Sequence, residues 1–301
     1  MIWPLRTMLF VPAHKLDWVR KVGRYRPDSV VLDLEDAVPP KIKKEARALV
    51  REAIDLLRQQ GIPAFVRINA LSQGGADDVP EIATAGFSGV MLPKANDVEE
   101  IRELDRLLCH AEGKAGLPMG AVAIMPLPET APGLWAARDL AAASRRCRGI
   151  IGVVGGPVSG DVASAVGFHP SMEGTEQLYL SSKLVLDSRA AGARYPMGSL
   201  IGTALDDLDS VRVLAKRAKA LGYSGAVLIH PSHVAVAAEV FTPSQEEVAY
   251  YAGLIQAMRE GQARGDGAVN YQGIMVDYAM LPHAEEVVAA ASRRQNPSNP
   301  S

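Results

Sequence analysis

The stretch SVVLDLEDAVPPKIKKEARALVREAIDLLRQQGIPAFVRIN, residues 29–69, decides the fold class of this chain. It opens with a short apolar run that ends in acids, SVVLDLED at 29–36. A segment with apolar residues at three- and four-residue spacing follows and stops at Gly61, before a second apolar run, AFVRIN at 64–69. A strand, a helix and a second strand in this order form a βαβ unit of a parallel sheet. The stretch therefore predicts an α/β protein.

The same alternation continues in both directions from this unit. Eight short apolar runs alternate with segments of helical period, and eight such units close naturally into a (β/α)₈ TIM barrel. A doubly wound open sheet uses the same units and is the competing architecture, but the strand count favours closure. The predicted strands are 8–13, 29–36, 64–69, 89–95, 121–127, 149–156, 197–202 and 226–231.

Polar side chains fall late in these runs or just after them. The carboxyl ends of the strands carry the chemistry in a barrel, so this placement predicts an active-site mouth. The residues concerned are Asp33, Glu35, Asp36, Arg67, Asn69, Lys94, Glu129, Asp161 and His230.

Two of these acids indicate a metal site. Glu129 stands in AVAIMPLPET and Asp161 in GGPVSGDVASAVG, each after an apolar run. Mg²⁺ takes one or two carboxylates in proteins and keeps its other positions for water and substrate. Either acid alone could instead cap the helix that follows it. As a pair at one barrel mouth they need a counter-charge, which a bound cation supplies.

Composition limits the class of partner. The chain has 301 residues, enough for one large barrel, with 32 basic and 34 acidic residues and a net charge of −2. No basic face or run of like charges indicates a nucleic-acid partner, so a small molecule is expected. No stretch approaches the ~18 apolar residues that a membrane span needs, and no cleavage signature marks the amino terminus. We expect a cytoplasmic protein without a membrane partner.

The last part of the chain has a different pattern. We predict a barrel domain over residues 1–242 and a helical and lid extension over 243–301. SQEEVAYYAGLIQAMREGQARG, beginning at Ser244, predicts one long helix, and Glu247 completes a capping box with that serine. The following GDGAVNYQGIMVDYAMLP predicts a loose segment, with a short helix over 283–294 after it. A helix with a mobile loop is a candidate lid.

A co-linear series of motifs resembles the citrate lyase beta-subunit-like proteins, a branch of the HpcH/HpaI aldolase superfamily that includes malyl-CoA and citramalyl-CoA lyases. The resemblance covers roughly residues 5 to 285, and a series in order is more specific than any one motif. The motifs are RTMLFVPAHK, DLEDAVPPKIKKEAR, FVRIN, MLPKA, the PET of Glu129, D-x₅-G at Asp161, EGTEQLYLSSKLVLDSRAAG, IHPSHVAVAAEVFTPSQEEV and QGIMVD.

The resemblance implies a carbon–carbon lyase of the oxo-acid-lyase type, a homotrimer or hexamer that depends on Mg²⁺, with Mn²⁺ as a substitute. Such an enzyme cleaves a 3-hydroxyacyl-CoA thioester to acyl-CoA and a 2-keto acid, or makes the same bond. The resemblance also implies the roles of site residues. Glu129 and Asp161 would bind the metal, Arg67 would bind the keto-acid carboxylate, and Glu35 and Asp36 would orient metal-bound waters. Asp277, in the lid, would be the acid/base, and Arg6 and Lys94 would contact substrate and CoA.

Alternatives remain open from the sequence. Arg67 could pair structurally with Glu35 or Asp36, and Lys94 could form a Schiff base as in covalent aldolases. The enzyme could act on free hydroxy-keto acids, or only as a subunit of a citrate lyase complex. The chain also departs from the family pattern, because GGPVSGD stands where FG-x-x-D is usual and Ala279 stands where the lid motif commonly has proline.

Overall fold

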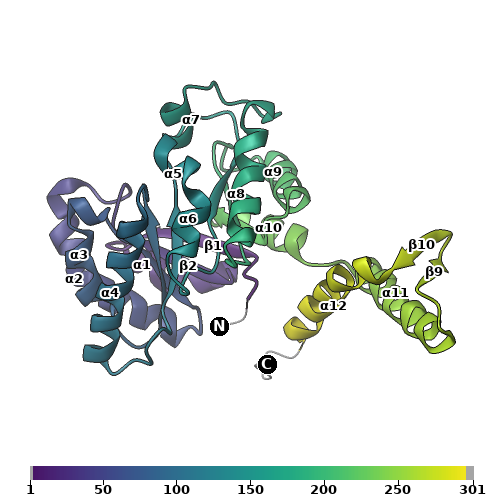
Figure 1. Cartoon of the computed structure of the whole chain (residues 1–301). Coiled ribbons are helices and arrows are strands. Elements are labelled where there is room, and N and C mark those ends of the chain that lie inside the picture. Colours follow the sequence, from purple (N-terminus) through teal and green to yellow (C-terminus); the bar gives the residue numbers. More distant parts are fainter. Residues whose placement is uncertain (1–2, 296–301) are drawn as a thin grey trace. The chain divides into compact units, whose positions relative to one another are not determined.

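The structure is a computed structural model that describes residues 3–295. They form two compact units, Trp3–Phe241 and the residues from Thr242 onward, and each is described by itself. The first unit holds eight strands of one parallel sheet with helices around them (Figure 1). The strands are β1 (Thr7–Pro12), β2 (Ser29–Asp33), β3 (Ala64–Arg67), β4 (Phe87–Pro93), β5 (Ala123–Leu127), β6 (Ile151–Gly155), β7 (Met197–Leu200) and β8 (Gly225–Leu228).

The sheet is a nearly closed barrel. Its order is β5-β4-β3-β2-β1-β8-β7-β6, so the first strand pairs with the last. That pairing excludes the doubly wound alternative, whose order reverses partway through the chain. Strand β5 pairs on the side away from β4 with the residues before β6, through one bridge in which Ile124 N donates to Arg146 O over 2.9 Å and Arg148 N donates to Ile124 O over 3.2 Å. The predicted (β/α)₈ TIM barrel is confirmed.

Side chains from all eight strands fill the barrel. The period of two along each strand sends alternate residues inward, and the largest of these is Phe65 on β3. Gly89 on β4 makes room for it, because a Cβ there would lie 2.3 Å from the Phe65 ring. The inward core residues include Met8, Val31, Phe65, Met91, Met125, Ile151, Met197 and Val227.

A second apolar layer lies between the strands and the helices. In α2, the buried Val50, Ile54 and Leu57 recur at three- and four-residue spacing and form one apolar face. Within residues 3–295, no helix has the length and apolar character that crossing a bilayer requires. The helices of this unit are α1 (Leu16–Lys21), α2 (Lys43–Gln59), α3 (Gly75–Ile82), α4 (Val98–Ala115), α5 (Ala131–Trp135), α6 (Ala137–Ala142), α7 (Asp161–Val166), α8 (Leu178–Ala190), α9 (Leu208–Leu221) and α10 (His233–Phe241).

The second unit is built from two helices and a hairpin. Helix α11 (Gln245–Arg264) begins at the predicted capping box. The prediction of a loose segment after it is wrong, since β9 (Ala268–Tyr271) and β10 (Ile274–Asp277) pair antiparallel there. Helix α12 (Leu281–Gln295) follows and begins earlier than predicted. Apolar side chains of α11, α12 and the hairpin form a separate core.

Candidate active site

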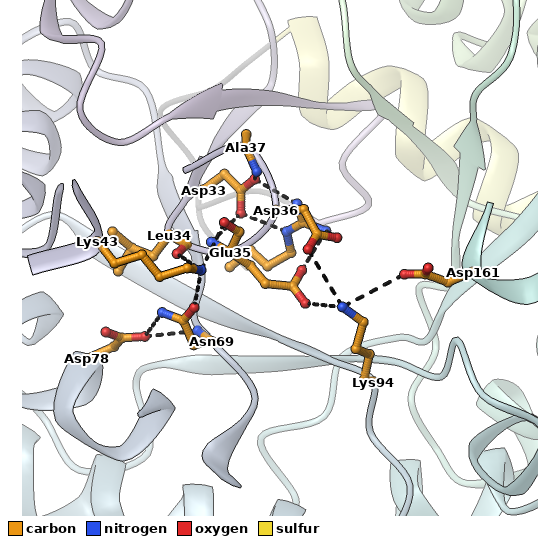
Figure 2. Close-up of polar contacts among 11 residues, drawn as sticks. Asp33, Leu34, Glu35, Asp36, Ala37, Lys43, Asn69, Asp78, Lys94 and Asp161 are labelled. Atoms are coloured by element: carbon orange, nitrogen blue, oxygen red, sulfur yellow. Dashed lines mark hydrogen bonds and ion pairs between the residues drawn. The ribbon is translucent and has the colours of Figure 1, made fainter. Parts of the chain in front are cut away.

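The chemistry-bearing side chains gather at the carboxyl ends of the barrel strands. Asp33 is the last residue of β2, Arg67 is the last of β3, and Lys94 directly follows β4. Glu129 lies two residues beyond β5, and Asp161 opens α7 in the connection after β6. Figure 2 shows Lys94 reaching between Glu35 and Asp36 on one side and Asp161 on the other.

Asp33 holds the arginine of the neighbouring strand. The two residues are partners in the β2–β3 register. Arg67 Nε donates to Asp33 Oδ1 over 2.7 Å, and Nη2 donates to Oδ2 over 2.6 Å. The same carboxylate accepts the backbone N–H groups of Glu35 (2.9 Å) and Ala37 (3.0 Å). The sequence placed Asp33 at the mouth but gave it no role, because its partners depend on the register.

Glu35 is buried between two cations. Its Oε2 lies 2.9 Å from Arg67 Nη1, and its Oε1 accepts from Lys94 Nζ over 2.7 Å. Burial raises the pKa of Glu35, although Arg67 and Lys94 oppose that rise. Asp36, in contrast, is exposed, with its carboxylate 3.6 Å from Lys94 Nζ and 4.0 Å from Arg67 Nη1. Arg67 therefore pairs closely with Glu35 and weakly with Asp36.

Lys94 has a backbone that lysine seldom adopts. Its φ is +51°, in the left-handed region where a non-glycine residue pays a steric cost. Burial favours its neutral form, but the hydrogen bond and charge of Glu35 outweigh this and raise the pKa of Lys94. An amine held protonated is not a nucleophile, which argues against the Schiff-base alternative.

Further hydrogen bonds fix the loop after β2. Lys43 Nζ, on α2, donates to the backbone oxygens of Leu34 and Glu35, each over 3.0 Å, and to the side-chain oxygen of Asn69. Asn69 in turn donates to Asp78 Oδ2 over 2.8 Å. Helix α2 and the residues after β3 thus hold Glu35 in place (Figure 2).

Glu129 is a half-buried acid with one buried oxygen that has no hydrogen-bond partner. Its Oε2 is shielded from solvent and makes no hydrogen bond. Burial raises its pKa to about 7; Glu35 and Asp161 add to the rise, while Arg67 and Lys94 oppose it. Its neighbour Thr130, rather than Glu129, caps α5 by accepting from Gly133 N over 3.2 Å. The helix-capping alternative for Glu129 is therefore wrong.

Asp161 completes the acidic pair. It is the first residue of α7, Gly160 is the N-cap, and no side chain makes a capping bond there. Its side chain is 51% exposed, and its Oδ2 lies 3.9 Å from Lys94 Nζ. The capping alternative for Asp161 is not what the structure shows.

This pair fits a hard divalent cation. An unpartnered buried carboxylate oxygen beside a second, half-exposed carboxylate is a costly arrangement that Mg²⁺ would relieve. Among residues 3–295, no three histidine, cysteine or acidic side chains are arranged to hold a metal. An ion on Glu129 and Asp161 would complete its coordination with water and substrate oxygens.

Two predicted residues are not part of this cluster: Arg6 lies elsewhere in the barrel, and Asp277 belongs to the second unit. Arg6 precedes β1, at the end of that strand away from the mouth, and its Nη2 lies 2.6 Å from Asp28 Oδ1. Asp277 ends β10 in the second unit, where its Oδ1 accepts from Ala279 N over 3.0 Å at the start of a short 3₁₀ helix. The structure brings the other predicted site residues together.

The fold and this site define a class, the (β/α)₈ barrels with a divalent-cation site at the carboxyl ends of their strands. The model of the HpcH/HpaI aldolase/citrate lyase family matches residues 6–231. The chain belongs to this family.

Individual relatives agree with that assignment. A citrate lyase subunit beta-like protein of Deinococcus radiodurans is 33% identical, over 95% of this chain and 96% of its own length. The mitochondrial citramalyl-CoA lyase of Rattus norvegicus is 31% identical, over 96% of this chain and 86% of its own. The crystal structure of CitE from Mycobacterium tuberculosis with magnesium, acetoacetate and coenzyme A has a TM-score of 0.73 and 26% identity, and the match covers 97% of this chain and 100% of that one.

Proposed function

We propose that this protein is a Mg²⁺-dependent carbon–carbon lyase that cleaves a 3-hydroxyacyl-CoA thioester to an acyl-CoA and a 2-keto acid, or joins the two. The observation that carries the proposal is the buried, unpartnered carboxylate oxygen of Glu129 beside Asp161. The structure of CitE with magnesium, acetoacetate and coenzyme A supports it, as does the similarity to a citramalyl-CoA lyase.

Glu129 and Asp161 would hold the ion, which would supply Lewis-acid stabilisation of the charge that develops on the substrate oxygen. Arg67 would bind the keto-acid carboxylate. A guanidinium has five N–H donors. Asp33 accepts from two of them and Glu35 lies 2.9 Å from Nη1, which leaves further donors at Nη1 and Nη2 for the substrate. The arginine is thereby oriented before the substrate arrives.

Glu35 and Asp36 would orient water molecules beside the ion, and Lys94 would bind the substrate as a cation. The rigid loop after β2 supports this, because Asp33 and Lys43 fix its backbone. Asp277 is proposed, from the family motif, as the acid/base that exchanges a proton with the acyl carbon. We also propose a homotrimer or hexamer.

Asp161→Ala tests the metal assignment. The purified variant should keep the circular dichroism of the parent, lose the heat of Mg²⁺ binding in titration calorimetry, and lose Mg²⁺-dependent cleavage of malyl-, citramalyl- and citryl-CoA. Asp55→Ala, on an exposed face of α2, is the matched control and should keep both. Full Mg²⁺-dependent activity in Asp161→Ala would show that this aspartate is not a ligand.

A further inference from the structure

A cavity of about 60 Å³ lies beside Glu129 and Asp161, at the carboxyl ends of β5, β6 and β7. A cavity of ~150 Å³ is enough for benzene, so this one admits only a few atoms. It lies next to the proposed metal ligands, where the reacting end of a substrate of the proposed lyase would bind. The size and charge of this cavity therefore limit which substituent the reacting end of the substrate can carry.

The wall of this cavity is mostly apolar. Leu127 comes from β5, Ile151 and Val153 from β6, and the hydroxyl-bearing Ser199 from β7. No lysine or arginine is among the described residues that line it, and its charged members are the two acids themselves. Nothing in this wall offers a counter-charge to an anionic group.

The basic side chains of the mouth are already engaged. Arg67 is held by Asp33 and Glu35, and Lys94, the proposed substrate-binding cation, is held by Glu35; neither of them lines this cavity. Lys43 donates to backbone oxygens and to Asn69. A cation between Glu129 and Asp161 would offset those two charges, and the remaining donors of Arg67 would take the one carboxylate that every 2-keto acid carries.

A further guanidinium lies behind the wall. Arg217 on α9 donates from Nη2 to Met172 O over 2.5 Å. Its Nη1 is buried without a hydrogen-bond partner and would be 3.4 Å from a Cβ built on Gly155, which separates it from the cavity: Gly155 lines the cavity and Arg217 does not. A substituent in the cavity thus meets glycine backbone and the uncharged amide of Gln177 on this side.

We propose that this cavity takes a small uncharged substituent, hydrogen or a short alkyl group, at the carbinol carbon of the substrate. The proposal rests on the lyase function. The carbinol carbon carries a carboxylate, the thioester arm and a third group, and this third group becomes the side chain of the 2-keto acid. The keto-acid product is then a monocarboxylate of the glyoxylate or pyruvate kind rather than a dicarboxylate such as oxaloacetate.

The first test compares substrates on the intact chain with Mg²⁺. Citramalyl-CoA carries methyl as the third group, malyl-CoA hydrogen, and citryl-CoA carboxymethyl. We expect kcat/KM for the methyl or the hydrogen compound to exceed that for the carboxymethyl compound at least tenfold, because the latter puts an unpaired charge against an apolar wall. Equal or faster cleavage of citryl-CoA overturns the proposal.

Binding separates this proposal from the lyase function. Calorimetric titration of the Mg²⁺-loaded protein with pyruvate and with oxaloacetate needs no turnover. Tighter binding of pyruvate supports the cavity assignment even if no thioester is cleaved. The absence of cleavage would refute the lyase function but not the cavity assignment. Binding of oxaloacetate as tight as or tighter than that of pyruvate overturns the cavity assignment whichever thioesters are cleaved.

Ser199→Lys places a cation in the cavity wall. It tests whether the lack of a counter-charge in this wall sets the preference for an uncharged substituent. The ratio of oxaloacetate to pyruvate affinity should rise at least tenfold. Ser199→Met, of similar length and without charge, should not raise that ratio. A folded Ser199→Lys protein with the parental ratio contradicts the proposal, and if the variant does not fold, the comparison of the two acids on the parent protein decides.

Discussion

At the scale of single residues, Asp33 holds other side chains of the candidate site in place, although neither of its oxygens is free to contact a substrate. Its two oxygens accept from Arg67 and from the backbone of Glu35 and Ala37. It therefore couples the arginine on β3 to the loop that carries Glu35 and Asp36. It is a positioning residue, and its effect should be visible in substrate binding as well as in turnover.

Asp33→Asn keeps the shape and removes the charge. A hydrogen bond to a charged group contributes about 1.5–3 kcal/mol, so we expect kcat/KM to fall roughly 10- to 100-fold, with KM for the keto acid rising in the condensation direction. Steady-state kinetics with Mg²⁺ measures both. Glu239→Gln breaks an exposed arginine pair on α10 and is the control. Unchanged kinetics in Asp33→Asn would show that Arg67 does not need this partner.

Glu129 carries a stability cost that depends on pH. Its folded-state pKa is about 7, against an ordinary value of 4.5, so folding favours the protonated form. The stability that comes from this proton is complete below pH 4.5, is lost as the pH rises from there to 7, and is absent above 7. A metal ion on the carboxylate would remove the cost at high pH.

Glu129→Gln should therefore raise the melting temperature of the metal-free protein by a few degrees at pH 8 and leave it nearly unchanged at pH 4.5. Differential scanning calorimetry in the presence of a chelator gives both values. Glu173→Gln, at an exposed position, should show no such difference between the two pH values. A gain at pH 4.5 as large as that at pH 8 would mean that the ionised carboxylate of Glu129 is not strained.

At the scale of elements, the barrel has its least strand pairing between β5 and β6, where a buried ion pair stands beside a single backbone bridge. Arg146 donates to both oxygens of Glu112, each over 2.7 Å, and Glu112 also accepts the backbone N–H groups of Gly120 and Val122 over 2.9 Å. Helix α4 is thus tied to the start of β5 and to the residues before β6. The site acids Glu129 and Asp161 follow these two strands.

Removing one partner of a buried ion pair costs about 3–5 kcal/mol, because the other charge stays uncompensated. Glu112→Ala should lower the melting temperature by on the order of 10 °C. Asp105→Ala, which removes the half-exposed second partner of Arg146, should cost much less. Thermal unfolding followed by circular dichroism compares the two variants. Equal losses of melting temperature in the two variants would show that the β5–β6 side of the barrel does not depend on Glu112.

Helices and strands can be predicted from the sequence where the pattern that specifies them lies in neighbouring residues. The apolar runs predict all eight strands, but several strands end earlier than predicted. Strand β2, for example, ends at Asp33, whose carboxylate accepts the backbone N–H groups of Glu35 and Ala37. The β9–β10 hairpin does not stand out in the sequence, because its turn pairs Gly273, at φ +84°, with Gln272, at φ +50°, where asparagine, aspartate or a second glycine is usual. Register is not local either, so the pairing of Asp33 with Arg67 could not be predicted.

At the scale of the whole molecule, the chain has separate hydrophobic cores. The barrel cores draw on residues between Leu5 and Phe241, and the core of the second unit draws on Leu254, Met258, Val276 and their neighbours. The barrel therefore has its own hydrophobic cores and contains both proposed metal ligands. The second unit contributes Asp277, the proposed acid/base.

Residues 1–242 alone should accordingly fold and bind Mg²⁺ as tightly as the full chain, while turnover falls at least 100-fold, the lower range for loss of a general acid or base. Calorimetry and steady-state assays measure the two properties. Asp277→Asn in the full chain is the matched variant: if the carboxylate is what the second unit supplies, both proteins lose turnover alike. A truncated barrel that keeps full turnover would leave Asp277 no role, whereas a much larger loss on truncation than in Asp277→Asn would mean that the second unit supplies more than one proton-transfer group.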